Sequence, residues 1–89
     1  MQPDDTDDKP FDAPVTVHSG GATRSIGSVR EAYDFLSGTD WPGERGPRHR
    51  DAEDACLKVF DGHRSRVDAR DGFIEAAREA GILDEADPA

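Results

Sequence analysis

The chain is 89 residues long and carries a formal net charge of −9, with 34% hydrophobic and 35% charged residues. This length fits one small domain, and the few large apolar side chains limit the size of its core. The sequence contains no run of 18 apolar residues and no charged start followed by an apolar stretch. We therefore expect no membrane association, no signal peptide and a cytoplasmic protein.

The negative charge is concentrated at the two ends of the chain. Residues 1–12 contain five acids and one lysine, and residues 84–89 contain three acids and no base. Segments of this composition bury too little apolar surface to fold alone. We therefore predict acidic disordered tails at 1–12 and 84–89, and a single α+β domain at 13–83.

The domain begins with a predicted β-hairpin. Residues 15–18 alternate apolar and polar side chains, residues 23–26 form a second short run of strand formers, and Gly20-Gly21 lies between the two runs. Glycine allows the positive φ angles that tight hairpin turns require. Because a two-stranded hairpin is marginally stable by itself, we expect its apolar side chains to pack on helices.

The first predicted helix opens at Ser28, because Ser28 and Glu31 have the spacing of a capping box. Apolar residues follow at helical intervals as far as Leu36, and Gly38 closes the helix. Residues 39–46 contain a proline and several glycines, which favour a loop.

Two further amphipathic helices are predicted, hinged at residues 61–63. The first runs from about Arg50 to Gly62, because basic residues before Arg50 are disfavoured in a first turn, where the helix dipole favours acids. The second opens with either Ser65 or Asp68 as its cap and ends at Gly81. Each helix has one apolar stripe, formed in the first by Ala52, Ala55, Cys56, Val59 and Phe60 and in the second by Ala69, Phe73, Ala76, Ala77 and Ala80.

The predicted fold class is therefore α+β, with an N-terminal two-stranded β-hairpin packed on three α-helices in the order β-β-α-α-α. So small a core leaves a narrow margin over the conformational entropy lost on folding. Dimerisation is a common way to widen that margin, so a homodimer is one prediction of the sequence.

A series of short motifs spans residues 13–82. In order they are Val15-x-Val17, Ile26-x-Ser28-Val29-x-Glu31-Ala32, Leu36, Trp41-Pro42, Gly46, Ala52-x-x-x-Cys56, Gly62 and Ala69-Arg70-x-x-Phe73-x-x-Ala76-Ala77-x-x-Ala80-Gly81. Together they resemble a family of short bacterial proteins known as domain of unknown function nine-eight-two. The resemblance implies a small α+β fold of the strand-strand-helix type, and it carries over no catalytic or binding residue.

The sequence offers little for catalysis or metal binding, and we expect no enzymatic activity, no cofactor and no metal. The soft metal ligands are His18, His49, Cys56 and His63, and they lack the local spacing of a zinc site. We expect a buried Cys56 and exposed histidines. Burial argues against a thiolate nucleophile, and a single cysteine forms no internal disulfide, which is compatible with a reducing cytoplasm.

The loop before the second helix contains the candidate interaction surface. Trp41, Arg45, Arg48, His49 and Arg50 combine the only tryptophan with a local group of bases, and Trp and Arg are common at interface hot spots. In the alternative interpretation, Trp41 packs back on the helices as a lid over the core, and the arginines pair with neighbouring acids. The sequence leaves both interpretations open.

Two functional hypotheses follow. The first is a small non-enzymatic protein-interaction or regulatory module that binds another protein or itself, and an exposed apolar patch beside the arginines of the loop would support it. The second is a nucleic-acid-binding module, which ranks lower because the net charge is negative. Its candidate contacts are Arg45, Arg48, Arg50, Arg64, Arg66 and Arg70.

Overall fold

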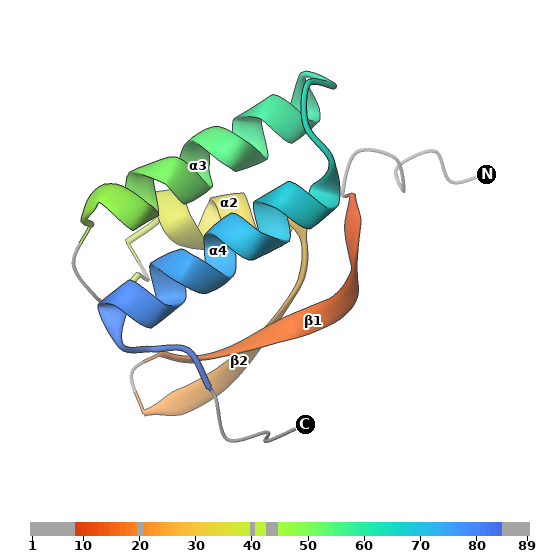
Figure 1. Ribbon diagram of the computed structural model, residues 1–89. Coiled ribbons are helices and arrows are strands. Elements are labelled where there is room, and N and C mark those ends of the chain that lie inside the picture. The colour runs from red at the N-terminus through yellow and green to blue at the C-terminus, as the bar shows by residue number, and fades with distance from the viewer. Residues whose placement is uncertain (1–8, 20, 40, 43–44, 85–89) are drawn as a thin grey trace.

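The computed structural model describes residues 9–19, 21–39, 41–42 and 45–84. Within them the three helices lie together on one side of a β-hairpin (Figure 1). The predicted α+β class and the order β-β-α-α-α are confirmed. The elements are strands β1 (Pro10–Ser19) and β2 (Ala22–Ser28) and helices α2 (Val29–Ser37), α3 (Pro47–Phe60) and α4 (Arg66–Ala80).

Strands β1 and β2 pair antiparallel, with Val15 opposite Ile26 and Ser19 opposite Ala22. Gly21 in the turn has a φ of 86°, which a residue with a Cβ adopts only under strain. The apolar side chains of both strands join those of the helices in one core, as the sequence predicts.

Strand β1 starts earlier than the domain boundary that the sequence suggests. It begins at Pro10, whereas residues 1–12 were expected to form a tail. The cause is Phe11, whose side chain is buried in the core although it lies in an acidic part of the sequence. The pairing register shifts between Pro10 and Val15, so β1 carries extra residues there that β2 does not match.

The segment after α4 returns to the hairpin and lies along the other edge of β1, as Figure 1 shows. The N–H of His18 donates to the carbonyl of Ile82 over 2.8 Å, and the N–H of Asp84 donates to the carbonyl of Thr16 over 3.0 Å. Asp84, expected at the start of the C-terminal tail, is therefore bonded to β1. The rest of the two predicted tails, residues 1–8 and 85–89, lies outside the described residues.

Helix α2 is capped by Ser28 as predicted, but Glu31 bonds the N–H one residue before the cap rather than that of Ser28 itself. The Ser28 hydroxyl accepts from the N–H of Glu31 over 3.1 Å, and the Glu31 carboxylate accepts from the N–H of Gly27 over 2.7 Å. Both bonds satisfy N–H groups that have no partner within the helix. Phe35 is buried on the inner face, whereas Tyr33 is only half-buried.

Helix α3 begins at Pro47, so the basic residues 48–50 do lie in its first turn, contrary to the sequence prediction. Proline suits this position because its missing N–H would be unpaired there. The favourable negative charge comes from α4, where Glu79 accepts from the N–H of Arg48 over 3.2 Å. A Cβ on Gly46 would lie 2.9 Å from the same carboxylate oxygen, so the glycine makes room for it.

Of the two caps that the sequence allows for α4, the structure uses Ser65, and the helix ends at Gly81 as predicted. The Ser65 hydroxyl accepts from the N–H of Asp68 over 3.4 Å. At the other end Gly81 has a φ of 76°, and the N–H of Ile82 donates to the carbonyl of Ala77 over 2.9 Å. This arrangement is the glycine-terminated helix end in which the chain folds back on the last turn.

Helices α3 and α4 pack closely through small residues. Ala52 on α3 and Ala69 on α4 are fully buried, and a Cβ on Gly72 would lie 3.5 Å from the Cα of Ala52. Phe73 is the largest of the fully buried side chains. Small residues thus allow the two helices to approach closely, and Phe73 fills the space beside them.

Candidate functional site

Trp41 is buried under side chains from all three helices, with 6% of its surface exposed. Its ring centroid lies 5.4 Å from that of Phe35 on α2, 5.0 Å from that of His49 on α3 and 6.3 Å from that of Phe73 on α4. All three pairs meet edge to face, a favoured geometry for aromatic rings. Trp41 is therefore packed on the core, as the lid interpretation expects, but the pairing of the arginines with acids that belongs to that interpretation is not found among the described residues for Arg45, which donates to backbone carbonyls.

His49 and Arg45 close the C-terminal end of α2. His49 is 3% exposed, and its Nε2 donates to the carbonyl of Leu36 over 2.7 Å. Arg45 donates to the same carbonyl over 2.9 Å and to the carbonyl of Gly38. The last carbonyls of a helix lack intrahelical partners, and positive charge beside them is favourable. The expectation of an exposed His49 was wrong, because its ring bonds the carbonyl of Leu36 and packs on Trp41.

The other two residues of the predicted surface, Arg48 and Arg50, are exposed on α3. Arg50 and Leu57 are seven residues apart, so they share one face of this helix. Leu57 is 44% exposed, and Leu57 and Val67 are the exposed large hydrophobic residues of the described part of the chain. An apolar side chain thus lies on the same helix face as one of the predicted arginines.

Leu57 borders an aromatic pair that bridges α2 and α3. The rings of Tyr33 and Phe60 meet edge to face with centroids 6.2 Å apart, and the guanidinium carbon of Arg30 lies 5.6 Å from the centroid of the Phe60 ring. Leu57 is one helical turn before Phe60, so the two side chains are neighbours on α3. We call this surface the α2–α3 face; it consists of Arg30, Tyr33, Arg50, Leu57 and Phe60.

Reasoning from the sequence missed Leu57 as a surface residue. The signal was present: Leu57 is apolar but lies off the buried stripe of its helix. Arg30 and Tyr33 gave no such signal, because only the tertiary packing of α2 against α3 brings them to Phe60.

The sole cysteine is unsuited to nucleophilic chemistry. Cys56 is fully buried, and burial, with a smaller effect from the charge of Glu53, raises the pKa of its thiol from 9.0 to about 12. The thiol is therefore protonated at neutral pH. Among the described residues, no group of three His, Cys, Asp or Glu side chains is placed to hold a metal ion. Nor does any helix of the described part have the length and apolar character that crossing a membrane requires.

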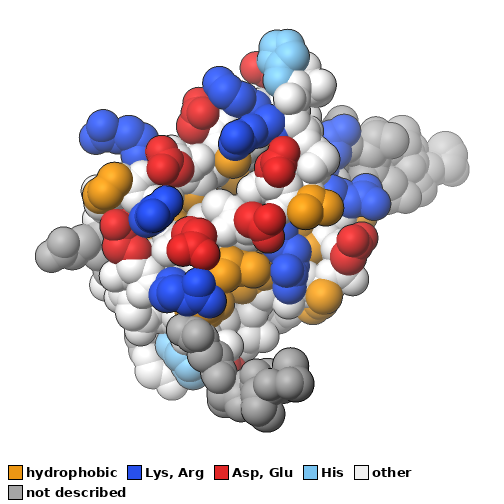
Figure 2. Space-filling view, viewed as in Figure 1, with side chains coloured by type: hydrophobic (Ala, Val, Ile, Leu, Met, Phe, Trp, Pro, Cys, Tyr) orange, Lys and Arg blue, Asp and Glu red, His pale blue; other side chains and the backbone are white. Residues whose placement is uncertain are grey.

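The arginines proposed for nucleic-acid binding are dispersed. Arg45 binds the end of α2, Arg70 donates through Nε to the carbonyl of Ala13 over 2.8 Å, and Arg66 lies 4.0 Å from the carboxylate of Asp12. On the face formed by α3 and α4, acidic and basic side chains alternate (Figure 2). Nucleic-acid affinity depends on clustered cations, so this arrangement does not favour the nucleic-acid hypothesis.

The family described as "Protein of unknown function (DUF982)" matches residues 13–84, and the chain belongs to this family. The resemblance drawn from the sequence motifs is thereby confirmed. The matched region ends at Asp84, the residue whose N–H is bonded to β1.

Among solved structures, the chain is similar to the NMR structure of Agrobacterium tumefaciens protein Atu1219. The two share 34% sequence identity with a TM-score of 0.75, over 94% of this chain and 84% of that one. No curated protein matches the chain. Neither the family nor this relative names a ligand or a reaction, so the function is argued from the surface of the molecule.

Proposed function

We propose that this protein is a small non-enzymatic interaction module that binds a protein partner, or a second copy of itself, through the α2–α3 face. The observation that carries the proposal is Leu57, a 44% exposed leucine beside the partly exposed pair Tyr33 and Phe60. Interfaces concentrate binding energy in aromatic and arginine side chains around such apolar centres. Arg30 and Arg50 supply the arginines.

The chemistry of the described residues supports a binding role over a catalytic one. The only thiol is buried and its pKa is raised to about 12. The buried histidine, His49, is engaged with a backbone carbonyl. A free buried cysteine also fits a reducing cytoplasm, the location we propose.

Self-association is the simplest form of this function. In a two-fold symmetric contact, each residue of one copy meets residues from the same face of the other copy. Glu53 lies between Arg50 and Leu57 along α3, so a partner copy would offer both an apolar side chain and a charge of the sign that the arginines attract.

A substitution of Leu57 tests the proposal. Leu57→Glu places a charge in the centre of the face, and we expect it to weaken association at least tenfold. Val67→Glu is the matched control, because Val67 is 53% exposed but lies on α4. Sedimentation across a range of concentrations measures self-association, and affinity capture from the native cell measures partner binding.

The two variants give a clear decision. Loss of the dimer, or of one captured partner, with Leu57→Glu alone supports the α2–α3 face. The proposal fails if Leu57→Glu and Val67→Glu behave alike in both measurements, with melting temperatures showing that both are folded.

A further inference from the structure

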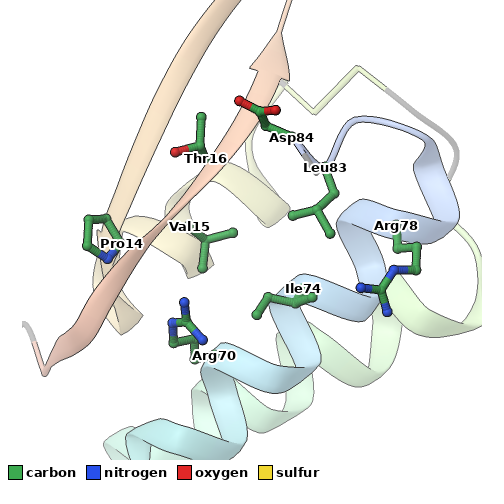
Figure 3. A pocket seen from close by; sticks show the side chains of 8 residues that line it. All are labelled: Pro14, Val15, Thr16, Arg70, Ile74, Arg78, Leu83 and Asp84. Carbon is green, nitrogen blue, oxygen red and sulfur yellow. The ribbon is translucent and has the colours of Figure 1, made fainter. Parts of the chain in front are cut away.

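A hollow of about 410 Å³ lies between β1 and α4. The apolar side chains of Val15, Ile74 and Leu83 point toward one another in it, and the guanidinium groups of Arg70 and Arg78 lie on either side of Ile74 (Figure 3). These residues are distinct from those of the α2–α3 face. The volume is in the range of sites that bind small molecules.

The two arginines and the isoleucine form one line on α4. Arg70, Ile74 and Arg78 are four residues apart, and this spacing puts them on the same helix face, one turn after another. Across from them, Figure 3 shows the carboxylate of Asp84 turned toward Thr16 and away from both guanidinium groups. The side of the hollow formed by α4 is therefore basic at its ends and apolar in its middle.

Arg70 is held in place by the hairpin. Its Nε donates to the carbonyl of Ala13 over 2.8 Å, in the stretch of β1 where the register shifts between Pro10 and Val15. The two terminal nitrogens of Arg70, Nη1 and Nη2, form no hydrogen bond or ion pair with any described residue. Because Nε holds the guanidinium group in place, its terminal nitrogens can pair with a carboxylate while the side chain loses little further conformational entropy.

The edge of β1 at this hollow is closed to a further strand. Residues Ile82 to Asp84 already pair with Thr16 and His18, and Pro14, the next residue along this edge, has no N–H to donate. Pairing of an extended peptide with this edge of β1 is thus disfavoured, and the hollow suits a small, compact ligand.

We infer that this hollow binds an amphipathic carboxylate, whose carboxyl group pairs with Arg70 and whose apolar body lies on the partly exposed Ile74 and Leu83, above the buried Val15. Arg78, which donates to Glu75 over 3.1 Å, adds positive charge at the other end. This inference is independent of the proposed function, because it concerns other residues and another ligand.

A titration followed by ¹H–¹⁵N NMR tests the inference, with hexanoate as the probe. We expect saturable shifts at Val15, Ile74, Leu83 and the Arg70 Nε–H, with a dissociation constant on the order of 1 mM for a ligand of this size. Acetate lacks the apolar body and hexan-1-ol lacks the carboxylate, so each is expected to bind at least tenfold more weakly.

Variants separate the hollow from non-specific binding. Arg70→Gln is expected to weaken hexanoate binding about tenfold, the effect of losing one charge-assisted hydrogen bond. Arg64→Gln, in the exposed turn between α3 and α4, is the control and should bind like the parent protein. Ile74→Glu puts a negative charge in the hollow and leaves the Arg70 side chain intact, so it tests the site if Arg70→Gln lowers stability.

The result that overturns the inference is equally specific. Chemical-shift changes spread over the whole surface would exclude this site. So would equal dissociation constants for hexanoate in the parent, Arg70→Gln and Ile74→Glu proteins. A carboxylate of this kind could be a free acid or the C-terminus of a peptide. Tighter binding of hexanoate than of N-acetyl-alanyl-leucine identifies a free acid as the source, and the reverse order identifies a peptide.

Discussion

The carbonyl of Leu36 is the acceptor on which two side chains converge, those of Arg45 and His49. Helix α2 has no basic residue in its last turn, so the charge and donors that favour its C-terminal end come from residues further along the chain. The same His49 ring packs edge to face on Trp41. One buried histidine thus links the end of α2 to the aromatic centre of the core.

Cys56 gives the stability of the protein a predictable dependence on alkaline pH. The pKa of its thiol is about 12 in the folded chain and ordinarily 9.0. Below pH 9 the thiol is protonated in both the folded and the unfolded chain, so it adds no pH dependence. Between these values the unfolded chain ionises first, and the free energy of unfolding falls by roughly 1.4 kcal/mol per pH unit from this group.

Urea unfolding of the parent protein and of Cys56→Ala, at several pH values from about 8 to 10.5, measures this effect. Tyrosine and lysine residues ionise in both proteins alike. The difference between the two plots of unfolding free energy against pH is therefore due to Cys56. We expect the advantage of the parent protein to shrink as pH rises above 9. Parallel curves would show that the thiol ionises as easily in the folded chain as in the unfolded one.

Among the elements, α3 is the one whose start depends on another helix. Three basic residues occupy its first turn, where the helix dipole disfavours them, and Glu79 of α4 accepts the N–H of Arg48 there. The carboxylate of Glu79 thus caps the start of α3, as Ser28 and Ser65 cap the starts of α2 and α4.

Removal of that carboxylate should weaken the start of α3. We expect Glu79→Ala to lower the free energy of unfolding by about 1 kcal/mol, the typical effect of losing a helix cap. Glu75→Ala is the matched control one turn earlier, because within the described residues Glu75 pairs with the exposed Arg78 alone, and such pairs contribute little. Chemical denaturation compares the two, and equal losses would contradict the role of Glu79.

The contrast between α3 and its neighbours shows which elements can be predicted from sequence. The starts of α2 and α4 were predicted closely, with Ser28 as the cap of one and Ser65 as one of two candidates for the other, because such caps act on residues three positions away. The start of α3 was placed too late because its partner, Glu79, is 31 positions distant. Reading the strands from alternation alone similarly missed Phe11, which is buried by contacts far along the chain.

At the scale of the whole molecule, the described chain returns at its C-terminal end to β1, the strand with which it begins. The segment from Ile82 to Asp84 covers the edge of β1 that β2 leaves open. An uncovered strand edge presents unpaired N–H and C=O groups and invites pairing with other chains. The C-terminal segment thus completes the sheet and also supplies Leu83 to the hollow between β1 and α4.

A proline substitution tests this closure. Asp84→Pro removes the N–H that donates to Thr16, whereas Asp84→Ala removes only the side chain, so the two variants isolate one backbone hydrogen bond. We expect Asp84→Pro to be less stable than Asp84→Ala by about 1 kcal/mol. Hydrogen exchange at the amides of Val17 and His18 should be faster in the proline variant. Identical exchange in the two would show that the edge is held by other contacts.

The predicted interaction surface was divided by the fold. Trp41 and His49 are in the core and Arg45 binds the end of α2, while Arg48 and Arg50 stay exposed. Sequence proximity grouped all five, but Trp41 and His49 are buried, and the exposed Arg45 is bonded to carbonyls at the end of α2. Whether the exposed arginines belong to a binding surface is the question that the Leu57 variants address.

The sequence by itself determined the order of the elements, their apolar stripes and the caps at Ser28 and Gly81. Each of these depends on residues within one or two turns of each other, so spacing along the chain reveals it. Only the tertiary structure decided the burial of Trp41 and His49, the start of α3 and the line of arginines beside β1. Those features rest on contacts between side chains far apart in sequence, and such contacts exist only once the helices have packed.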